Sequence, residues 1–254
     1  MKNLALVVAI AFTIILQTTS CKKDKNDVPT IPQNIYQTSL TNPSLEELQA
    51  FFEAGYDTIN GNVELTNIVG LLNLKALSNV KKIRGYLVIK DNEDLISFEG
   101  LGNLMSIGNS LAIVNDNSLV NIDGINNLLT IGGQLILLDN DSIINIDGLS
   151  NLHSIDEDLV IVNNTPLVNI DGLSSLQSIG GGIELTVNIS LVNIDGLSDL
   201  ETIGTYLKIK GNHSISDLCG IRNALANGVS GEIIIKDNLY NPTVADIIAG
   251  NCSQ

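Results

Sequence analysis

The sequence predicts a mainly β fold, a right-handed parallel β-solenoid built from coils of 24 residues. Two observations support this prediction. Apolar residues recur at intervals of 24 residues from Leu87 to Leu207, and aromatic residues make up only 4% of the chain, with no Trp. A core built from branched aliphatic residues favours extended structure. A repeat of this length indicates stacked coils that bury a shared core, and parallel crossovers are nearly always right-handed.

The repeat unit begins at equivalent residues that are 24 positions apart: Leu87, Leu111, Leu135, Leu159, Ile183 and Leu207. Counted from these residues, the unit reads L-x-I-x-x-N-x-x-L-x-x-I-D-G-L-x-x-L-x-x-I-G-G-x. Positions 1 and 3 alternate as in a strand with one buried face. The later apolar positions recur every three residues, which suits short strands and tight corners. Val63 and Ile235 mark the ends of the repeat.

The strand signature and its return segment resemble leucine-rich repeats, and resemble more closely the receptor L domain. Examples are Leu149-Ser150-Asn151-Leu152-His153-Ser154-Ile155 and Ile179-Gly180-Gly181-Gly182-Ile183. These phrases are similar to members of that group found in bacterial surface lipoproteins. The resemblance covers about residues 43–254. It implies a leucine-rich-repeat-like fold and a surface location, whereas a fold does not fix a function.

Residues 1–20 are predicted to be a lipoprotein signal peptide. A basic start precedes an apolar run from Leu4 to Leu16, which is shorter than a membrane span. The small residues before Cys21 resemble a lipobox, which implies lipidation of Cys21. The charged residues that follow resemble the start of outer-membrane lipoproteins, so we expect an outer-membrane, cell-surface location, with residues 21–42 as a flexible tether. The alternative is an ordinary cleaved signal with a free Cys nearby.

Caps are expected at both ends of the solenoid, because open ends would expose core and strand edges. Residues 43–60 are predicted as an N-terminal helical cap that starts at a capping box, Ser44-Leu45-Glu46-Glu47, and ends at Gly55. Residues 61–229 form the predicted solenoid and 230–254 the C-terminal cap. A disulfide between Cys219 and Cys252 is expected to close this cap. A reactive cysteine pair or a metal site is the alternative.

Position 6 of the unit forms a polar column, which has either a binding or a structural interpretation. A structural ladder, in which each side chain bonds corner backbone groups, is the favoured interpretation. Its members are Asn92, Asp116, Asn140, Asn164, Asn188, Asn212 and Asn238. The recurrent glycine pairs, such as Gly132-Gly133 and Gly180-Gly181, are predicted to be corners with positive φ.

Position 13 places an acidic residue in each of five coils. Each precedes a Gly, and turn chemistry explains an Asp at such a corner. Two alternatives are a weak cation site, for example for Ca²⁺, and a carboxylate pair for glycoside hydrolysis. Because the acids are part of the repeat, the turn interpretation is preferred. The column consists of Glu99, Asp123, Asp147, Asp171 and Asp195.

Positions 2 and 4 are predicted to face outward from the main strand, and in the three middle coils they are apolar. A patch of this kind often marks an interaction site, for a protein partner or a second copy of the chain. Plain β-propensity on a solvent face, or cover by the N-terminal tether, are the alternatives. The candidate binding face consists of Ala112, Val114, Ile136, Leu138, Val160 and Val162.

The composition excludes some functions. A formal net charge of −15 argues against nucleic-acid binding. The two His residues have no partner at metal-ligand spacing, and no nucleotide or hydrolase motif is present, so no catalytic residue, metal or cofactor is predicted. The sequence therefore predicts a non-catalytic, lipid-anchored binding, adhesion or scaffold protein with a protein or glycan ligand. A glycan-degrading β-helix enzyme and a passive structural spacer are the alternatives.

Overall fold

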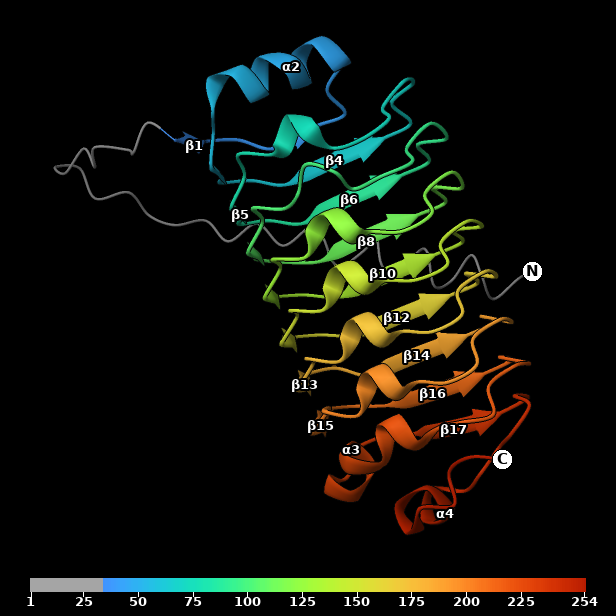
Figure 1. Cartoon of the computed structure of the whole chain (residues 1–254). Helices are drawn as coiled ribbons and strands as arrows, with labels where there is room; N and C mark the ends of the chain where they lie inside the picture. The colour runs from blue at the N-terminus through green and yellow to red at the C-terminus, as the bar shows by residue number, and fades with distance from the viewer. Residues whose placement is uncertain (1–33) are drawn as a thin grey trace, which may run out of the picture. The chain divides into compact units, whose positions relative to one another are not determined.

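The structure is a computed structural model, and it describes residues 34–254. The predicted signal peptide, Cys21 and most of the predicted tether lie outside these residues. The described chain is one compact unit made of two parallel β-sheets, with few helices (Figure 1). The prediction of a mainly β, solenoid-like repeat with parallel strands is confirmed.

Each coil contributes one strand to the larger sheet, which we call sheet B; the first of these strands has two residues and the others have four. The strands lie in the sheet in the same order as the coils follow one another along the chain, so each strand pairs with its equivalents in the neighbouring coils. Its strands are β2 (Leu40–Thr41), β4 (Val63–Thr66), β6 (Leu87–Lys90), β8 (Leu111–Val114), β10 (Leu135–Leu138), β12 (Leu159–Val162), β14 (Ile183–Thr186), β16 (Leu207–Lys210) and β17 (Ile233–Lys236).

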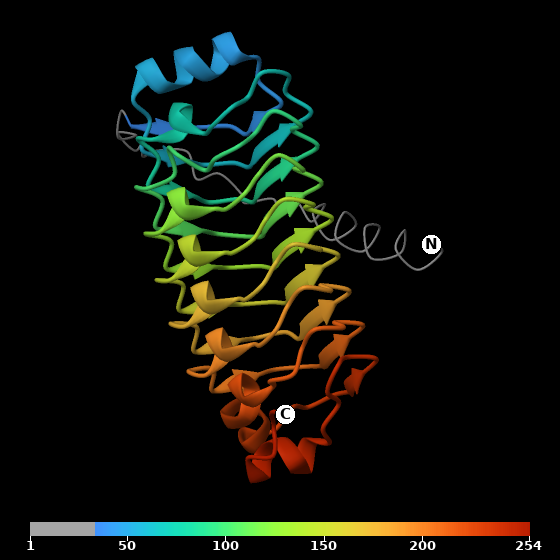
Figure 2. The ribbon, with the colours of Figure 1, turned by 45° about the vertical axis from the view of Figure 1, so that its right-hand side comes forward.

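The second sheet, sheet A, uses one two-residue strand from each coil. It runs in the same coil order. Its strands are β1 (Ile35–Tyr36), β3 (Thr58–Ile59), β5 (Lys82–Ile83), β7 (Ser106–Ile107), β9 (Thr130–Ile131), β11 (Ser154–Ile155), β13 (Ser178–Ile179) and β15 (Thr202–Ile203). Figure 2 shows the strands of sheet B stacked along one side of the unit.

The strand register equals the sequence period. Leu135 of β10 pairs with Leu111 of β8 and with Leu159 of β12, each 24 residues away. The first and third residues of each four-residue strand point into the core, as the alternation predicted; Leu135 and Leu137, for example, are fully buried. Because the same apolar position recurs in every coil, each column of equivalent residues forms a continuous apolar row in the core of the stack.

Short 3-10 helices follow sheet B in most coils and turn the chain toward sheet A (Figure 1). Four of them begin at an Asp-Gly pair, and a preceding Asn side chain accepts the backbone N–H of the Asp, as Asn145 does from Asp147 at 3.2 Å. The Asp-Gly motif therefore starts a helical turn. The 3-10 helices are Lys75–Leu77, Asp123–Ile125, Asp147–Leu149, Asp171–Leu173, Asp195–Leu197 and Cys219–Ile221.

The N-terminal cap is the helix α2 (Leu45–Ala54), drawn at the blue end of Figure 1. The predicted capping box is confirmed: Glu47 N donates to Ser44 Oγ at 3.2 Å, and Ser44 N donates to Glu47 Oε2 at 2.7 Å. Gly55 ends the helix in the left-handed region, with φ of 68°. Leu48 and Phe51 are buried against the first coil, so α2 covers the open end of the core.

The C-terminal cap contains α3 (Arg222–Asn227), β17 and α4 (Val244–Ala249). β17 extends sheet B by pairing with β16, and Thr243 and Gly250 cap α4. The predicted disulfide between Cys219 and Cys252 is present. It joins the last 3-10 helix to the residues after α4, so the end of the chain is fixed to the end of the core.

The ordered stack begins earlier than the sequence predicted. β1 pairs with β3, and β2 pairs with β4, although both lie within the segment 21–42 that was predicted to be a flexible tether. Leu40 of β2 is buried and Ser39 Oγ accepts the backbone N–H of Asn62 at 3.0 Å. Residues 34–42 therefore form part of a coil, whose register of 23 residues to Val63 differs from the regular period.

The predicted polar ladder at position 6 is confirmed. Its members from Asn92 to Asn212 are fully buried. Asn164 shows the pattern: its amide Nδ2 donates to Leu137 O at 3.0 Å, and its backbone N–H donates to Asn188 Oδ1 at 3.0 Å. The ladder thus links each corner to a strand carbonyl of the preceding coil and to the ladder side chain of the next coil, which satisfies polar groups inside the stack.

The positive-φ corner lies at position 5 and not at the glycine pairs. Asn, Asp, Val187 or Gly211 occupies this position in successive coils, with φ between 54° and 70°. Gly132, Gly133, Gly180 and Gly181 are not in the left-handed region, so that prediction was wrong. A Cβ at Gly132 would lie 2.5 Å from the carbonyl oxygen of Gly108. At Gly132 the backbone of the neighbouring coil therefore approaches too closely for a side chain, although Asp156 occupies the equivalent position of the next coil.

Candidate binding surfaces

The outward face of sheet B consists of the side chains at unit positions 2 and 4. The six residues of the predicted binding face all lie on it, in the adjacent strands β8, β10 and β12. Ala112, Ile136 and Val160 form one row in register, and Val114, Leu138 and Val162 form the second. The structure therefore brings all six together into one apolar patch.

These side chains are less exposed than expected. Five have exposed fractions of 3–8%, and Val114 is half-buried. Each lies between branched side chains on the two neighbouring strands, at the strand spacing of about 4.8 Å, which accounts for part of this burial. The patch is therefore a packed apolar surface and does not consist of freely projecting side chains.

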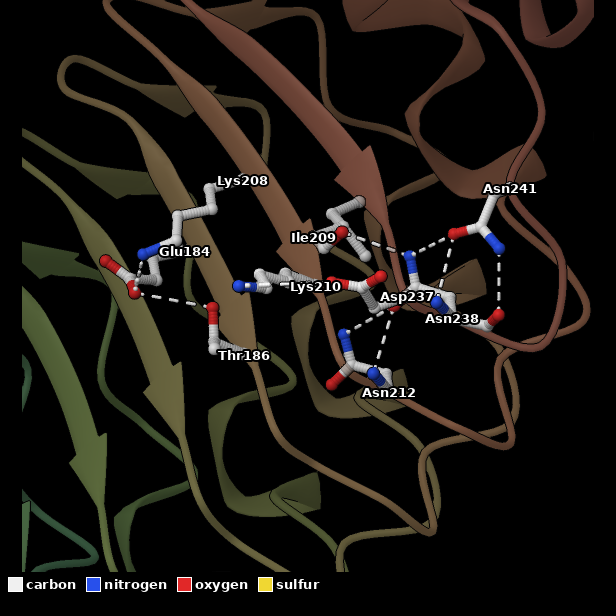
Figure 3. Close-up of polar contacts among 9 residues, drawn as sticks. All are labelled: Glu184, Thr186, Lys208, Ile209, Lys210, Asn212, Asp237, Asn238 and Asn241. Carbon is white, nitrogen blue, oxygen red and sulfur yellow. Dashed lines mark hydrogen bonds and ion pairs between the residues drawn. The ribbon is translucent and has the colours of Figure 1, made fainter. Parts of the chain in front are cut away.

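Charged residues replace the apolar ones toward the C-terminal end of this face (Figure 3). Lys208 Nζ and Glu184 Oε1 form an ion pair of 2.7 Å between β16 and β14. Thr186 Oγ1 donates to the same carboxylate oxygen at 3.3 Å. Lys210 Nζ lies 3.9 Å from Asp237 Oδ2, just beyond β17. The apolar patch is thus bordered by half-buried polar groups, which a ligand could contact.

The other end of the face is also polar. Glu64 and Thr66 of β4 are half-buried, and Lys90 Nζ lies 3.6 Å from Asp91 Oδ2. The change from polar to apolar and back again therefore runs along the axis of the stack. This pattern arises from side-chain identity alone, since the strands themselves are equivalent.

The acidic column at position 13 is exposed in all five coils. Asp123, Asp147, Asp171 and Asp195 are each the first residue of a 3-10 helix, and Glu99 lies in the equivalent turn. Burial, and secondarily the negative charges of Asp217 and Asp171, raise the pKa of Asp195. Among the described residues no three His, Cys, Asp or Glu side chains are grouped closely enough to hold a metal ion. The geometry thus favours turn structure for these acids.

The sequence interpretation missed a second apolar column, at unit position 10. Its side chains are exposed, in contrast to the packed patch on sheet B. We call it the exposed ridge, and it consists of Leu72, Ile96, Val120, Ile144, Val168 and Val192. The 24-residue period would have revealed it, because the position is apolar in six successive coils. It was overlooked because the adjacent position 9 accounts for the regular core pattern.

Comparisons with protein families and with curated proteins give no match to this chain. Among the described residues, none of the helices has the length and apolar character needed to cross a membrane.

Proposed function

We propose that this protein is a non-catalytic binding or scaffold protein of the bacterial cell surface, attached to the outer membrane through a lipid on Cys21. The proposal extends to a right-handed winding of the coils and to a receptor L-domain-like fold, both expected from the repeat and its resemblance. The ligand would be a protein or a glycan. A repeat stack offers a long, rigid surface for such a ligand.

The observation that supports this function is the pattern along the outward face of sheet B. Three middle strands carry only apolar residues there, while β14 and β16 carry Glu184, Lys208 and Lys210. A packed apolar centre with a polar rim is the usual composition of a protein interface. The half-buried polar residues of the rim would form hydrogen bonds and ion pairs with the ligand, and the apolar centre would offer a rigid surface for apolar contacts.

Surface location can be tested by itself. Cells that produce the full chain should incorporate labelled palmitate into it, and Cys21→Ser should abolish the incorporation. External protease should digest the protein on intact cells if it faces outward. Retention of the label in the Cys21→Ser variant would contradict lipidation at this residue, and full protection from protease in intact cells would contradict surface exposure.

Binding can be tested with the purified chain on a glycan array and against labelled surface proteins. Ile136→Lys with Leu138→Lys should reduce binding at least about tenfold. Lysine can extend its charged end away from the sheet, which limits the loss of stability. Lys208→Gln with Lys210→Gln tests the rim without altering the patch. Leu129→Lys, at an exposed apolar residue outside this face, is the matched control.

Thermal unfolding of each variant separates loss of binding from loss of fold. If both the patch and the rim variants fold and bind like the unaltered chain, sheet B is not the binding face. If the chain binds none of the probes, or cleaves a glycan on the array, the proposed non-catalytic binding function is contradicted.

A further inference from the structure

The exposed ridge contains six of the exposed large apolar side chains among the described residues. Its six side chains have exposed fractions of 42–57%. Branched aliphatic residues are common in cores, and a single exposed one needs no explanation. Six of them at one position in successive coils form a continuous apolar stripe, and such a stripe does need an explanation.

Backbone hydrogen bonds hold the ridge residues side by side. Ile96 N donates to Leu72 O at 3.2 Å, and Val168 N donates to Ile144 O at 3.2 Å. The bonds from Ile144 N to Val120 O and from Val192 N to Val168 O are each 3.0 Å. With a spacing of about 4.8 Å per coil, the six side chains span roughly 24 Å. The ridge is therefore regular and fixed by the fold.

The surface next to the ridge is acidic. The acidic column at position 13 follows five of the six ridge residues by three positions, so Asp123, for example, belongs to the same coil as Val120. Leu72 is followed instead by Lys75, whose Nζ forms an ion pair of 3.0 Å with Glu99. Between the two columns lie Asn side chains such as Asn121, which accepts the backbone N–H of Asp123 at 3.2 Å. A ligand that covers the ridge would therefore meet a row of carboxylates along one edge.

The charge of the chain itself disfavours a second copy as the ligand. The formal net charge is −15, and two ridges that met face to face would bring acidic surfaces together. A partner with apolar residues on one side and basic residues beside them would complement both columns. This is the charge pattern of a basic amphipathic helix.

We propose that the exposed ridge is a docking surface for a basic amphipathic helix of a partner protein. A helix rises about 1.5 Å per residue, so roughly 16 residues would match the length of the ridge. Its apolar stripe repeats about every 5.4 Å, close to the spacing of the coils. Lys or Arg residues along one edge would face the acidic column. This surface lies outside sheet B and goes beyond the proposed function.

The upper end of the ridge meets the N-terminal cap. Leu72 borders a shallow hollow of about 240 Å³ that Leu45 and Leu48 of α2 also line. Leu45 is 47% exposed, so it continues the apolar surface onto α2. At the lower end, Ser216 follows Val192 in the column and interrupts the apolar run. These boundaries define a site of limited length.

The test uses the full chain and a synthetic probe: a 17-residue peptide of Leu and Lys with all leucines on one helical face. Fluorescence anisotropy of the labelled peptide measures binding. A peptide of the same composition with a scrambled order is the control probe, and it should bind at least about tenfold more weakly because it cannot form an apolar stripe. Equal binding of the two peptides would overturn the proposal.

Ile144→Ser with Val168→Ser should weaken binding of the amphipathic peptide at least about tenfold, because two apolar contacts are lost. Met105→Ser with Leu129→Ser is the matched control, since both residues are exposed and lie outside the ridge. It should change the affinity less than about twofold. Circular dichroism and thermal unfolding would verify that both variants fold. Equal effects of the two pairs would overturn the proposal.

The acidic edge is tested by Asp123→Asn, Asp147→Asn and Asp171→Asn together. Affinity should fall, and the remaining binding should depend less on salt. Neutralising Asp156, Glu157 and Glu201, which are exposed and lie toward sheet A, removes the same charge elsewhere. If this control lowers the affinity and the salt dependence of binding as much as the three Asp→Asn changes do, only the net charge attracts the peptide, and the proposal fails.

Two further outcomes bear on the assignment. If the full chain sediments as a dimer that Ile144→Ser with Val168→Ser dissociates, the ridge joins two copies and the partner helix is rejected. Ile136→Lys with Leu138→Lys should leave peptide binding unchanged. Failure of the ridge proposal and failure of the sheet B proposal are therefore distinguishable.

Discussion

Asp116 accepts two hydrogen bonds from Asn92 through a single carboxylate oxygen. Its Oδ1 lies 2.8 Å from the backbone nitrogen and 3.1 Å from the side-chain amide nitrogen of Asn92. In the next coil the equivalent residue is Asn140, whose amide donates to Ile113 O at 3.1 Å. An ionised Asp cannot make this donation. Its second oxygen, Oδ2, is buried without a hydrogen-bond partner among the described residues.

Burial raises the pKa of Asp116 to about 6, and the negative charge of Asp91 adds to the rise, although the two bonds from Asn92 oppose it. A protonated Oδ2 could replace the missing amide donor. The native state therefore binds a proton that the unfolded chain, with an ordinary Asp, releases at lower pH. Stability should fall as the pH rises from about 4 to about 6, and level off above that range.

We predict that Asp116→Asn stabilises the protein by about 2–3 kcal/mol at pH 7, since the amide restores the donor and removes the buried charge. Urea unfolding at pH 4 and pH 7.5 would measure this. The free energy of unfolding of the unaltered chain should differ between these two pH values, and Asp116→Asn should remove most of that difference. Asp147→Asn, at an exposed acid, is the control and should leave that difference in place. A pH dependence that Asp116→Asn does not alter would contradict the prediction.

Val187 occupies the left-handed corner position with φ of 60°. The equivalent residues in the neighbouring coils are Asn163 and Gly211, which tolerate this conformation. A β-branched residue there is strained. We predict that Val187→Asn raises the free energy of unfolding by about 1 kcal/mol, measured by urea denaturation. Its side chain is 42% exposed, so little packing is lost.

The reverse change in a neighbouring coil supplies the control for Val187. Asn163→Val should destabilise the chain by at least a similar amount, because it places a β-branched residue at φ of 56°. The Asn163 amide also donates to Asp139 Oδ1 at 2.7 Å, and this bond would be lost. Stabilisation by Asn163→Val, or destabilisation by Val187→Asn, would show that backbone strain does not govern this corner.

The sequence period predicts most of the fold because each unit position has one environment. Leu135 in one coil therefore indicates the place of Leu159 in the next, and both caps carry clear signals such as the capping box at Ser44. The first partial coil was not predicted, because its pairing of Leu40 with Val63 departs from the period. The glycine pairs were assigned to the wrong cause, since close approach between coils depends on the stacking geometry and leaves no local signal.

The surfaces were less predictable than the fold. Alternation correctly placed Ile136 and Leu138 on the outward face of sheet B, but it cannot give the burial of an outward side chain. The exposed ridge was missed because Val120 follows the buried Leu119 directly, and two adjacent apolar residues do not indicate which one is buried. Exposure depends on how the corner turns, and that is set by the Asn and Asp side chains of the whole column.

Gly148 lies at one of the closest approaches between two coils. A Cβ at this position would overlap the carbonyl oxygen of Ile122 in the preceding coil, which is backbone and cannot move aside. We predict that Gly148→Ala lowers the melting temperature by at least about 8 °C, corresponding to roughly 3 kcal/mol. Gly102 is the matched control, since a Cβ added there would lie 3.9 Å from its nearest neighbouring atom. Gly102→Ala should be close to neutral, and equal effects of the two changes would contradict the argument.

The disulfide between Cys219 and Cys252 closes a loop with a sequence separation of 33 residues. By the loop-entropy relation it should contribute about 3–4 kcal/mol to stability. It also holds the end of the chain where Leu218 N donates to Cys252 O at 2.9 Å and Asp217 bridges to Ser253. Without the bond, the last strand and α4 can separate from the stack and leave Ile221 and Leu225 less protected.

We therefore predict that Cys219→Ser with Cys252→Ser lowers the free energy of unfolding by about 3–4 kcal/mol. Hydrogen exchange should increase first in β17 and α4, and only later in the strands of the middle coils, because coils contact mainly their neighbours. Cys21→Ser is the control, since it changes the third cysteine and leaves the bond intact. Reduction of the Cys21→Ser chain should reproduce the effect of the double substitution. Uniform exchange along the stack would instead show that the disulfide stabilises the whole unit cooperatively.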